Sequence, residues 1–421
     1  MRISTLHIYN LARNSMADAN QAINKTQEQL STGKRVLSAA DDPVAATRIQ
    51  QLNNNLALVE QYNKNIVIAE NNLSLEESTL DSANNLLQRI EELAIQAGNT
   101  ASLSTGDYAA LASEVDSRLD ELFNIVNTRN SNGDYIFSGF KSDSPAFTGD
   151  SVNGFRFAGD EGQMQIKIDN NTNIDVSDSG KSLFVDVPSG SNNVITSANP
   201  NNRSNPPVSI SIGQVVDQSA YDDFYPEDII IQFNEDTDIV PAGKNFTVTE
   251  RSTGKIIEAN HPYTAGEELI YNGVSIRISG NPASADSGAG LAGDQLFVDS
   301  TDTQDVLTTL MRLRDAMNAH DGSQESIDRI ESVVASSITN LSSSQESISE
   351  TVTKIGARNN TLESTKELHL DTELVSKEIL SDIGDIDYAE AASRLSQQTL
   401  ILQASQASFL RISELTLFSR L

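Results

Sequence analysis

The sequence predicts a multidomain α+β protein, in which both chain ends build a long antiparallel, coiled-coil-like helical rod that carries an inserted β-rich domain. Two observations lead to this prediction. Near both ends of the chain, apolar residues recur every seven positions, as they do in helices that pack side by side. Between Gly139 and Asp302 this period disappears, and all but one of the 10 prolines and most of the 23 glycines lie there.

The N-terminal segment has a narrow apolar stripe. Its members are seven residues apart: Tyr9, Met16, Ile23, Leu30 and Leu37. Ala12, Ala19 and Thr26 occupy the intervening positions. A stripe this narrow is typical of a helix that packs along one partner helix.

The C-terminal segment supplies a second stripe, and residues 381–421 are predicted to form one amphipathic helix. Leu395, Leu402 and Phe409 recur every seven residues, with Ala391 and Ile412 at the offsets between them. Ordinary core packing is the more frequent role of such a helix. The stripe by itself therefore leaves both core packing and subunit contact open.

A connector and a long helix follow the N-terminal segment. Gly33 interrupts the first helix, and Asp42 with Pro43 supplies an N-cap and a first helical residue. From Pro43 to Gly98 the heptad spacing is strict: Leu52, Val59, Ile66, Leu73, Leu80, Leu87 and Ala94. A helix of this length extends over roughly 80 Å, far beyond the mean for globular proteins.

The second half of the chain mirrors the first. After a shorter helix near 111–126 and another after Thr303, a second long heptad repeat comprises Ile327, Val334, Leu341, Ile348, Ile355 and Leu362. This nesting predicts three domains: a terminal coiled-coil domain (1–42 plus 381–421), a helical rod (43–140 plus 303–380) and the β-rich insert (141–302). In this plan the terminal helices pair with each other, and so do the two long helices.

Within the insert, apolar residues alternate with a period of two, which is the pattern of half-buried strands. Phe246 and Val248 form one such pair, and residues 274, 276 and 278 form a longer series. Asn272-Gly273 between apolar runs predicts a hairpin turn, since both residues tolerate positive φ.

Composition excludes several classes of protein. The net charge of −30 and the pI of about 4.3 argue against a nucleic-acid partner, which requires a basic surface. There are no cysteines, hence no disulfides or thiolate metal sites. No apolar run reaches the length of a membrane span, and the N-terminus lacks the apolar core of a cleaved signal peptide, so neither membrane insertion nor signal-peptide cleavage is expected.

The search for chemistry finds no predicted catalytic residue, cofactor or metal. Residues 288–293 match the dinucleotide pattern GxGxxG, but a strand rather than a helix is expected after them, so a flexible loop is the better interpretation. The four histidines lie in separate segments without a second ligand at metal spacing. The aspartate and asparagine clusters do not fit a calcium loop and are interpreted as turns.

The two ends of the chain resemble the flagellin superfamily. The resemblance is carried by MRIST and QEQLSTGKRVLSAADDPVAATRIQQL at the start and by SDIGDIDYAEAASRLSQQTLILQASQASFLRISELTLFSRL at the end. Filament flagellins share the STG and DD pattern. The MRIST start, the proline at 43 and the ending SELTLFSRL are closer to the hook-filament junction proteins of that superfamily. The resemblance covers about the first 140 and the last 120 residues, and the insert carries no motif that extends it.

The resemblance implies a structural protein of the extracellular flagellum, secreted through the type III export channel. Its implied partners are hook-associated protein 1, flagellin, further copies of the chain in a ring, and a flagellar export chaperone. The apolar stripes then become an assembly seam, defined by eight residues: Tyr9, Met16, Ile23, Leu30, Leu395, Leu402, Phe409 and Ile412. Helices with so narrow a seam are expected to be disordered in the monomer and to fold on assembly.

Three alternatives stay open at this point. A filament-forming flagellin would share the same ends, and a surface adhesin would act through the β-rich insert. A hydrolase is disfavoured, since no paired catalytic groups are found.

Overall fold

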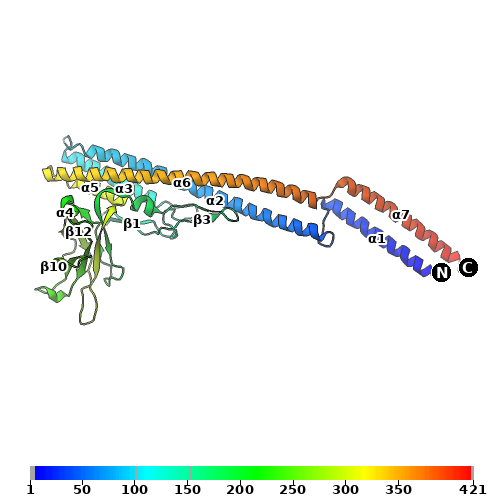
Figure 1. Cartoon of the computed structure of the whole chain (residues 1–421), viewed down its shortest axis with the longest axis horizontal. Coiled ribbons are helices and arrows are strands. Elements are labelled where there is room, and N and C mark those ends of the chain that lie inside the picture. Colours follow the sequence, from blue (N-terminus) through cyan, green and yellow to red (C-terminus); the bar gives the residue numbers. More distant parts are fainter. Residues whose placement is uncertain (1–4, 101, 152–153, 419–421) are drawn as a thin grey trace. The chain divides into compact units, whose positions relative to one another are not determined.

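Long helices from both ends of the sequence and a β-rich middle region make up the chain (Figure 1). The computed structural model describes the backbone of residues 5–100, 102–151 and 154–418. Side chains are described for these residues except 5, 6, 8 and 412–418. The predicted α+β class with helical ends and a β-rich middle is confirmed.

The helices begin and end close to the predicted signals. They are α1 (Thr5–Thr32), α2 (Pro43–Ala97), α3 (Thr105–Val126), α4 (Gln218–Asp222), α5 (Val306–Asn318), α6 (Gln324–Gly384) and α7 (Tyr388–Phe418), with a π-helical turn η1 (Lys181–Val185) and a 3-10 turn η2 (Asp236–Asp238). Gly33 ends α1 with φ of 71°, and Asp42 caps α2 by accepting from the Ala45 amide at 3.0 Å.

The C-terminal helix differs from its prediction. Instead of one helix from Ser381, α6 continues to Gly384 and α7 begins at Tyr388. The break has a local cause, because the Asp387 carboxylate accepts hydrogen bonds from the amides of Ala389 and Glu390, as an N-cap does.

The chain forms two compact units. The first, unit 1, comprises residues 1–66, 168–170 and 363–421, and the second, unit 2, comprises residues 67–167 and 171–362. Both long helices therefore contribute to each unit. The three predicted domains stay predictions, and each unit is described by itself below.

In unit 1, α1 packs against α7, and the first part of α2 lies against the last part of α6. The Tyr62 ring of α2 stacks on His369 of α6 with centroids 5.9 Å apart. His369 Nδ1 lies 3.0 Å from Asn63 Oδ1, and the ring is buried. His369 is thus a packing residue at this helix contact.

In unit 2, the heptad residues of the two long helices are buried. This holds for Leu73, Leu80 and Leu87 on α2 and for Leu341 and Ile348 on α6. Helix α3 packs against α5 and starts with a capping box between Ser104 and Asp107. The predicted heptads thus form the helical core of this unit.

The strands of unit 2 all lie between residues 147 and 303. They are β1 (Phe147–Asp150), β2 (Gly154–Phe157), β3 (Gln165–Lys167), β4 (Asn173–Asp175), β5 (Pro188–Ala198), β6 (Ser209–Ile210), β7 (Gln214–Val215), β8 (Ile229–Phe233), β9 (Asn245–Glu250), β10 (Ile256–Pro262), β11 (Glu268–Tyr271), β12 (Val274–Ser279) and β13 (Gln295–Thr303).

An antiparallel five-stranded sheet has the order β10-β9-β8-β13-β5, and in a second sheet β12 pairs with β11, β6 and β7. Two further strand pairs are β1-β2 and β3-β4. The hairpin predicted at Asn272-Gly273 joins β11 to β12, with φ of 48° and 79° at the two residues. The predicted loop at 288–293 likewise precedes a strand, β13.

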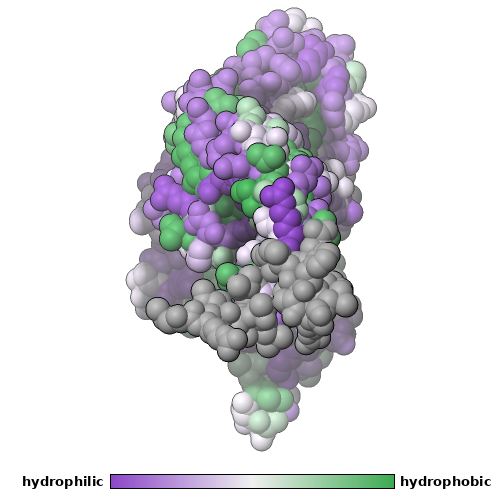
Figure 2. Space-filling view, turned by 90° about the vertical axis from the view of Figure 1, so that its right-hand side faces the viewer, coloured by the Kyte–Doolittle hydropathy of each residue, from purple (hydrophilic) through white to green (hydrophobic). Residues whose placement is uncertain are grey.

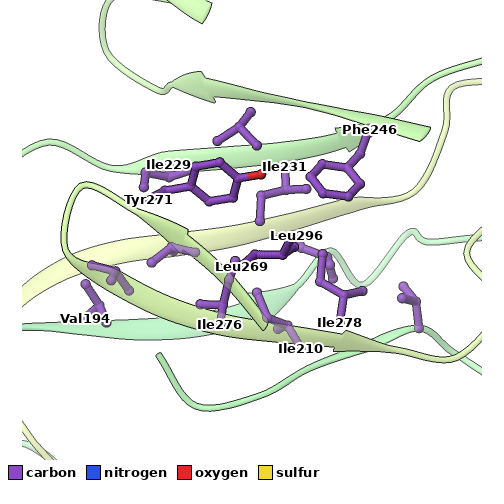
Figure 3. Close-up of a cluster of buried hydrophobic side chains, with 14 of the residues drawn as sticks. Val194, Ile210, Ile229, Ile231, Phe246, Leu269, Tyr271, Ile276, Ile278 and Leu296 are labelled. Carbon is purple, nitrogen blue, oxygen red and sulfur yellow. The ribbon is translucent and has the colours of Figure 1, made fainter. Parts of the chain in front are cut away.

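The two larger sheets share one hydrophobic core (Figure 3). Ile229 and Ile231 of β8 and Leu296 of β13 meet Ile276 and Ile278 of β12 in this core. Strand alternation explains why these residues form the core, because every second side chain of a strand points to the same face of its sheet.

Candidate assembly surface

Helices α1 and α7 form an antiparallel pair from the two ends of the chain. Near one end of the pair, the Tyr9 and Phe409 rings lie 5.1 Å apart. Near the other, the Thr26 hydroxyl donates to Gln398 Oε1 at 2.9 Å. The heptad spacing explains the pairing, since it keeps one stripe of each helix turned toward the other.

The predicted seam residues lie along this pair. Six of them are partly buried: Met16, Ile23, Leu30, Leu395, Leu402 and Phe409. Tyr9 retains 44% of its exposure despite its ring contact. The eighth, Ile412, lies in α7, but its side chain is outside the described residues. The seam's role in assembly stays a proposal, taken up below.

The fully buried side chains of the pair are small or polar and lie near its connector end. Thr26 and Ala391 are buried, and so is Gln29 at the end next to the connector. Between residues 9 and 44, no large apolar side chain is fully buried, and the same holds for residues 392–411. Two helices alone leave part of a leucine side chain exposed, which explains why the seam residues with described side chains are not fully buried.

The connector, residues 33–42, forms hydrogen bonds and an ion pair with the residues that join α6 to α7. The Arg35 amide donates to the Gly384 carbonyl at 2.7 Å, and the Ile386 amide donates to the Gly33 carbonyl at 2.9 Å. The Arg35 guanidinium donates to the Ile383 carbonyl at 2.8 Å and 3.1 Å, and Lys34 Nζ lies 2.6 Å from Asp385 Oδ1.

Two carboxylates give the connector its shape. The pKa of Asp41 is lowered to about 2, mainly by the hydrogen bond from the Lys25 ammonium group and next by the one from the Ser38 amide. The amide of Ala45 and, to a lesser extent, Arg35 lower the pKa of Asp42. Both carboxylates are therefore ionised at neutral pH, and their negative charge is favourable next to the α2 N-terminus.

Sequence reasoning missed a set of apolar residues that point away from the α1/α7 contact. Leu11 is 60% exposed, Leu400 66% and Ile401 49%. Others in unit 1 are Leu368, Leu370, Leu374, Val375 and Tyr388. Figure 2 shows hydrophobic residues interspersed with hydrophilic ones on the side of the molecule that it displays. The adjacent apolar residues at 400 and 401 were the available signal, since a single stripe accommodates only one of them.

Neither a metal site nor a membrane-spanning helix is found in the described part of the chain. No group of three or more histidine, aspartate or glutamate side chains there is arranged to hold a metal ion. None of the described helices has the length and apolar character needed to cross a membrane. The candidate site for assembly is the apolar surface of the terminal helices.

Comparisons with known proteins agree with the resemblance of the chain ends. Residues 3–142 match the family model of the bacterial flagellin N-terminal helical region. Flagellar hook-associated protein 3 of Salmonella typhimurium is 33% identical over 189 residues, which cover 45% of this chain and 58% of that protein. Flagellin 1 of Proteus mirabilis is 31% identical over 144 residues, or 34% of this chain and 38% of that protein.

A solved structure extends the likeness to the fold. The crystal structure of flagellar hook associated protein-3 from Legionella pneumophila is 25% identical, with a TM-score of 0.52, and the match covers 80% of this chain and 98% of that one. The match with the curated hook-associated protein 3 spans little more than half of that protein's length. The chain is thus similar to the flagellar hook-associated proteins 3 over part of their length, and its residues 3–142 are similar to the N-terminal helical region of bacterial flagellins.

Proposed function

We propose that this chain is a structural axial protein of the extracellular bacterial flagellum, and that it forms the junction ring between hook-associated protein 1 and the flagellin filament. The observation that carries the proposal is the α1/α7 pair, which joins both chain ends without enclosing a large apolar residue between 9 and 44 or between 392 and 411. Such a pair gains stability when neighbouring subunits cover it.

In this proposal the two kinds of apolar residue have different roles. The assembly seam, which includes Leu402 and Phe409, holds α1 to α7. The outward residues Leu11, Leu400 and Ile401 contact neighbouring copies in the ring, because burying an apolar side chain of this size stabilises by about 1.5 to 3 kcal/mol. Before export, a flagellar chaperone would shield the same surface.

The direct test is electron microscopy of the purified chain added to hook ends that already carry hook-associated protein 1. The expected result is addition at those ends, followed by filament growth once flagellin is supplied. Failure to add there would contradict the junction role. Flagellin proper is the second candidate, given the flagellin likeness of the N-terminal region, and a chain that polymerises alone into filaments would favour it.

Substitutions in the seam sharpen this test. Leu402→Ala with Phe409→Ala should abolish addition at the hook end, since every subunit loses the same packing. The matched control is Val240→Ala with Ile270→Ala, two exposed apolar residues of unit 2, which should add normally. Equal behaviour of the two double variants would show that the seam has no role in assembly.

A further inference from the structure

A pocket with a volume of about 720 Å³ lies in unit 2, between the sheet of β12 and the helices α5 and α6. Strand alternation aims polar side chains into it: Ile276 and Ile278 of β12 face the hydrophobic core, whereas Ser275, Arg277 and Ser279 line the pocket. On α5, the lining residues Thr308, Arg312 and Asp315 follow each other at helical spacing, so they share one face.

Positive charge is concentrated in this pocket, although the chain as a whole has 59 acidic and only 29 basic residues. The charged lining residues are Arg277, Arg312, Arg314 and Arg329, with Glu268 and Asp315 as the acidic ones. A surplus of guanidinium groups in so acidic a protein calls for a reason beyond solubility.

Only one of these arginines is fully matched by carboxylates. Arg314 lies 2.7 Å from Asp116 Oδ1 and 2.8 Å from Asp315 Oδ1. Arg277 lies 3.8 Å from Glu268 Oε2, near the limit of an ion pair. Arg329 has no ion pair among the side chains that the structure describes.

Arg312 makes its hydrogen bonds to neutral groups, and the Asp305 carboxylate is the negative charge that acts on it. Its Nη2 donates to the Gly213 carbonyl at 2.6 Å, and its Nη1 donates to the side-chain oxygens of Asn193 and Gln304. Its Nε is buried without a hydrogen-bond partner in the described structure. Burial lowers the pKa of Arg312 to about 10, so the side chain is still charged at neutral pH. Among the described residues, no carboxylate lies within ion-pair distance of Arg312.

We propose that this pocket binds a small organic polyanion, about the size of a disaccharide, that carries sulfate, carboxylate or phosphate groups. Guanidinium groups bind such groups through paired hydrogen bonds. The serine and threonine hydroxyls of the lining add further donors and acceptors for a hydroxylated ligand. The volume falls in the usual range for small-molecule pockets. This inference goes beyond the axial role and does not rest on it.

The test is titration calorimetry of the full chain with two probes, a sulfated heparin disaccharide and inorganic tripolyphosphate, at low salt. Saturable binding of one molecule per chain is expected for at least one probe. Tighter binding of the disaccharide would identify an acidic sugar as the natural class of ligand, and tighter binding of tripolyphosphate would identify a phosphate compound.

Arg277→Gln with Arg329→Gln should weaken that binding about tenfold or more. Both side chains are exposed, so the fold and melting temperature should persist, and the two single variants should show intermediate losses. The control Arg251→Gln removes an exposed arginine of the same unit that lies outside the pocket. The proposal is overturned if neither probe saturates, if the double variant binds like the unchanged chain, or if the control loses as much affinity.

Discussion

The same seven-residue apolar spacing leads to different burial in the two units of this protein. In unit 2, Leu73, Leu80 and Leu87 of α2 are fully buried. In unit 1, Leu52 of the same helix and Leu402 of α7 remain partly exposed, and only Ile66, the last α2 residue of that unit, is fully buried among the α2 heptad residues there. The spacing is equal, so the difference comes from how many elements surround the residues. A heptad stripe therefore predicts which side of a helix makes contact, and the number of neighbours determines how completely that side is buried.

The difference in burial affects the stability of the two regions. Isolated helices are marginal in water, and helix stability in proteins comes mainly from packing of the apolar face. The α1/α7 pair has one layer of packing, while the sheets of unit 2 enclose a continuous core. We therefore expect the terminal helices to be the least stable part of the free chain.

The largest expected effect comes from placing one substitution in each region. Leu296→Ala removes a fully buried side chain from the core of unit 2 and should lower the free energy of unfolding by about 2 to 5 kcal/mol. Leu402→Ala removes a partly exposed side chain and should lower the free energy of unfolding of the unassembled chain by less than about 1 kcal/mol. Urea denaturation followed by circular dichroism measures both, and equal losses would remove the distinction between the regions.

A second prediction uses a buried carboxyl group of unit 2. Glu76 Oε1 accepts from the Asp178 amide at 2.9 Å, and Asp178 is paired at 2.6 Å with Arg358, which also lies 3.9 Å from Asp175. Burial, and then the negative charge of Asp178, raises the pKa of Glu76 from 4.5 to about 8. The folded chain thus keeps this proton at pH values where the unfolded chain has lost it.

Stability should consequently fall as pH rises from about 4.5 to about 8, by roughly 1.4 kcal/mol per pH unit from this group, and level off above that. Glu76→Gln should abolish this part of the slope, so the variant's advantage should grow with pH. Denaturation midpoints at pH 5, 6, 7 and 8 measure it. An identical pH slope in the variant would mean that Glu76 is already ionised in the folded chain.

The smallest effect is expected at the connector. Lys34 and Asp385 form an exposed ion pair, with side chains 51% and 43% accessible. Exposed pairs contribute about 0 to 1 kcal/mol, so Lys34→Gln should leave the melting curve nearly unchanged. Arg35→Gln, which loses hydrogen bonds to the Ile383 carbonyl, serves as the comparison and should have the larger effect. The reverse order would show that the ion pair, and not Arg35, holds the connector.

Much of the fold could be predicted because its signals are local. Gly33, the cap at Asp42 and the Asn272-Gly273 turn act within a few residues, and the heptads fix which side of each helix packs. The break at residues 385–387 was missed, since the apolar pattern alone does not indicate it. The order of the strands could not be predicted either. Strand β13 pairs with both β5 and β8, and no local sequence pattern encodes a pairing between residues about a hundred positions apart.

For the candidate site, the sequence predicted the side of contact but not its extent. Leu395 and Leu402 are partly buried on α7, as expected for the side that periodicity defines, and their role in assembly stays a prediction. The exposed Leu400 and Ile401 were missed, because exposure depends on which neighbours are present. The arginines of the unit 2 pocket come from distant segments, so no spacing in the sequence relates them.

In the proposed role, the terminal helices depend on neighbouring subunits for their stability. Amide hydrogen exchange of the free chain, read by mass spectrometry, tests it most directly. We expect α1 and α7 to exchange fast, while the buried stretch of α2 in unit 2, residues 67–94, stays protected. Protection of α1 and α7 equal to that of residues 67–94 would contradict the claim, since the pair would then be stable without any neighbour.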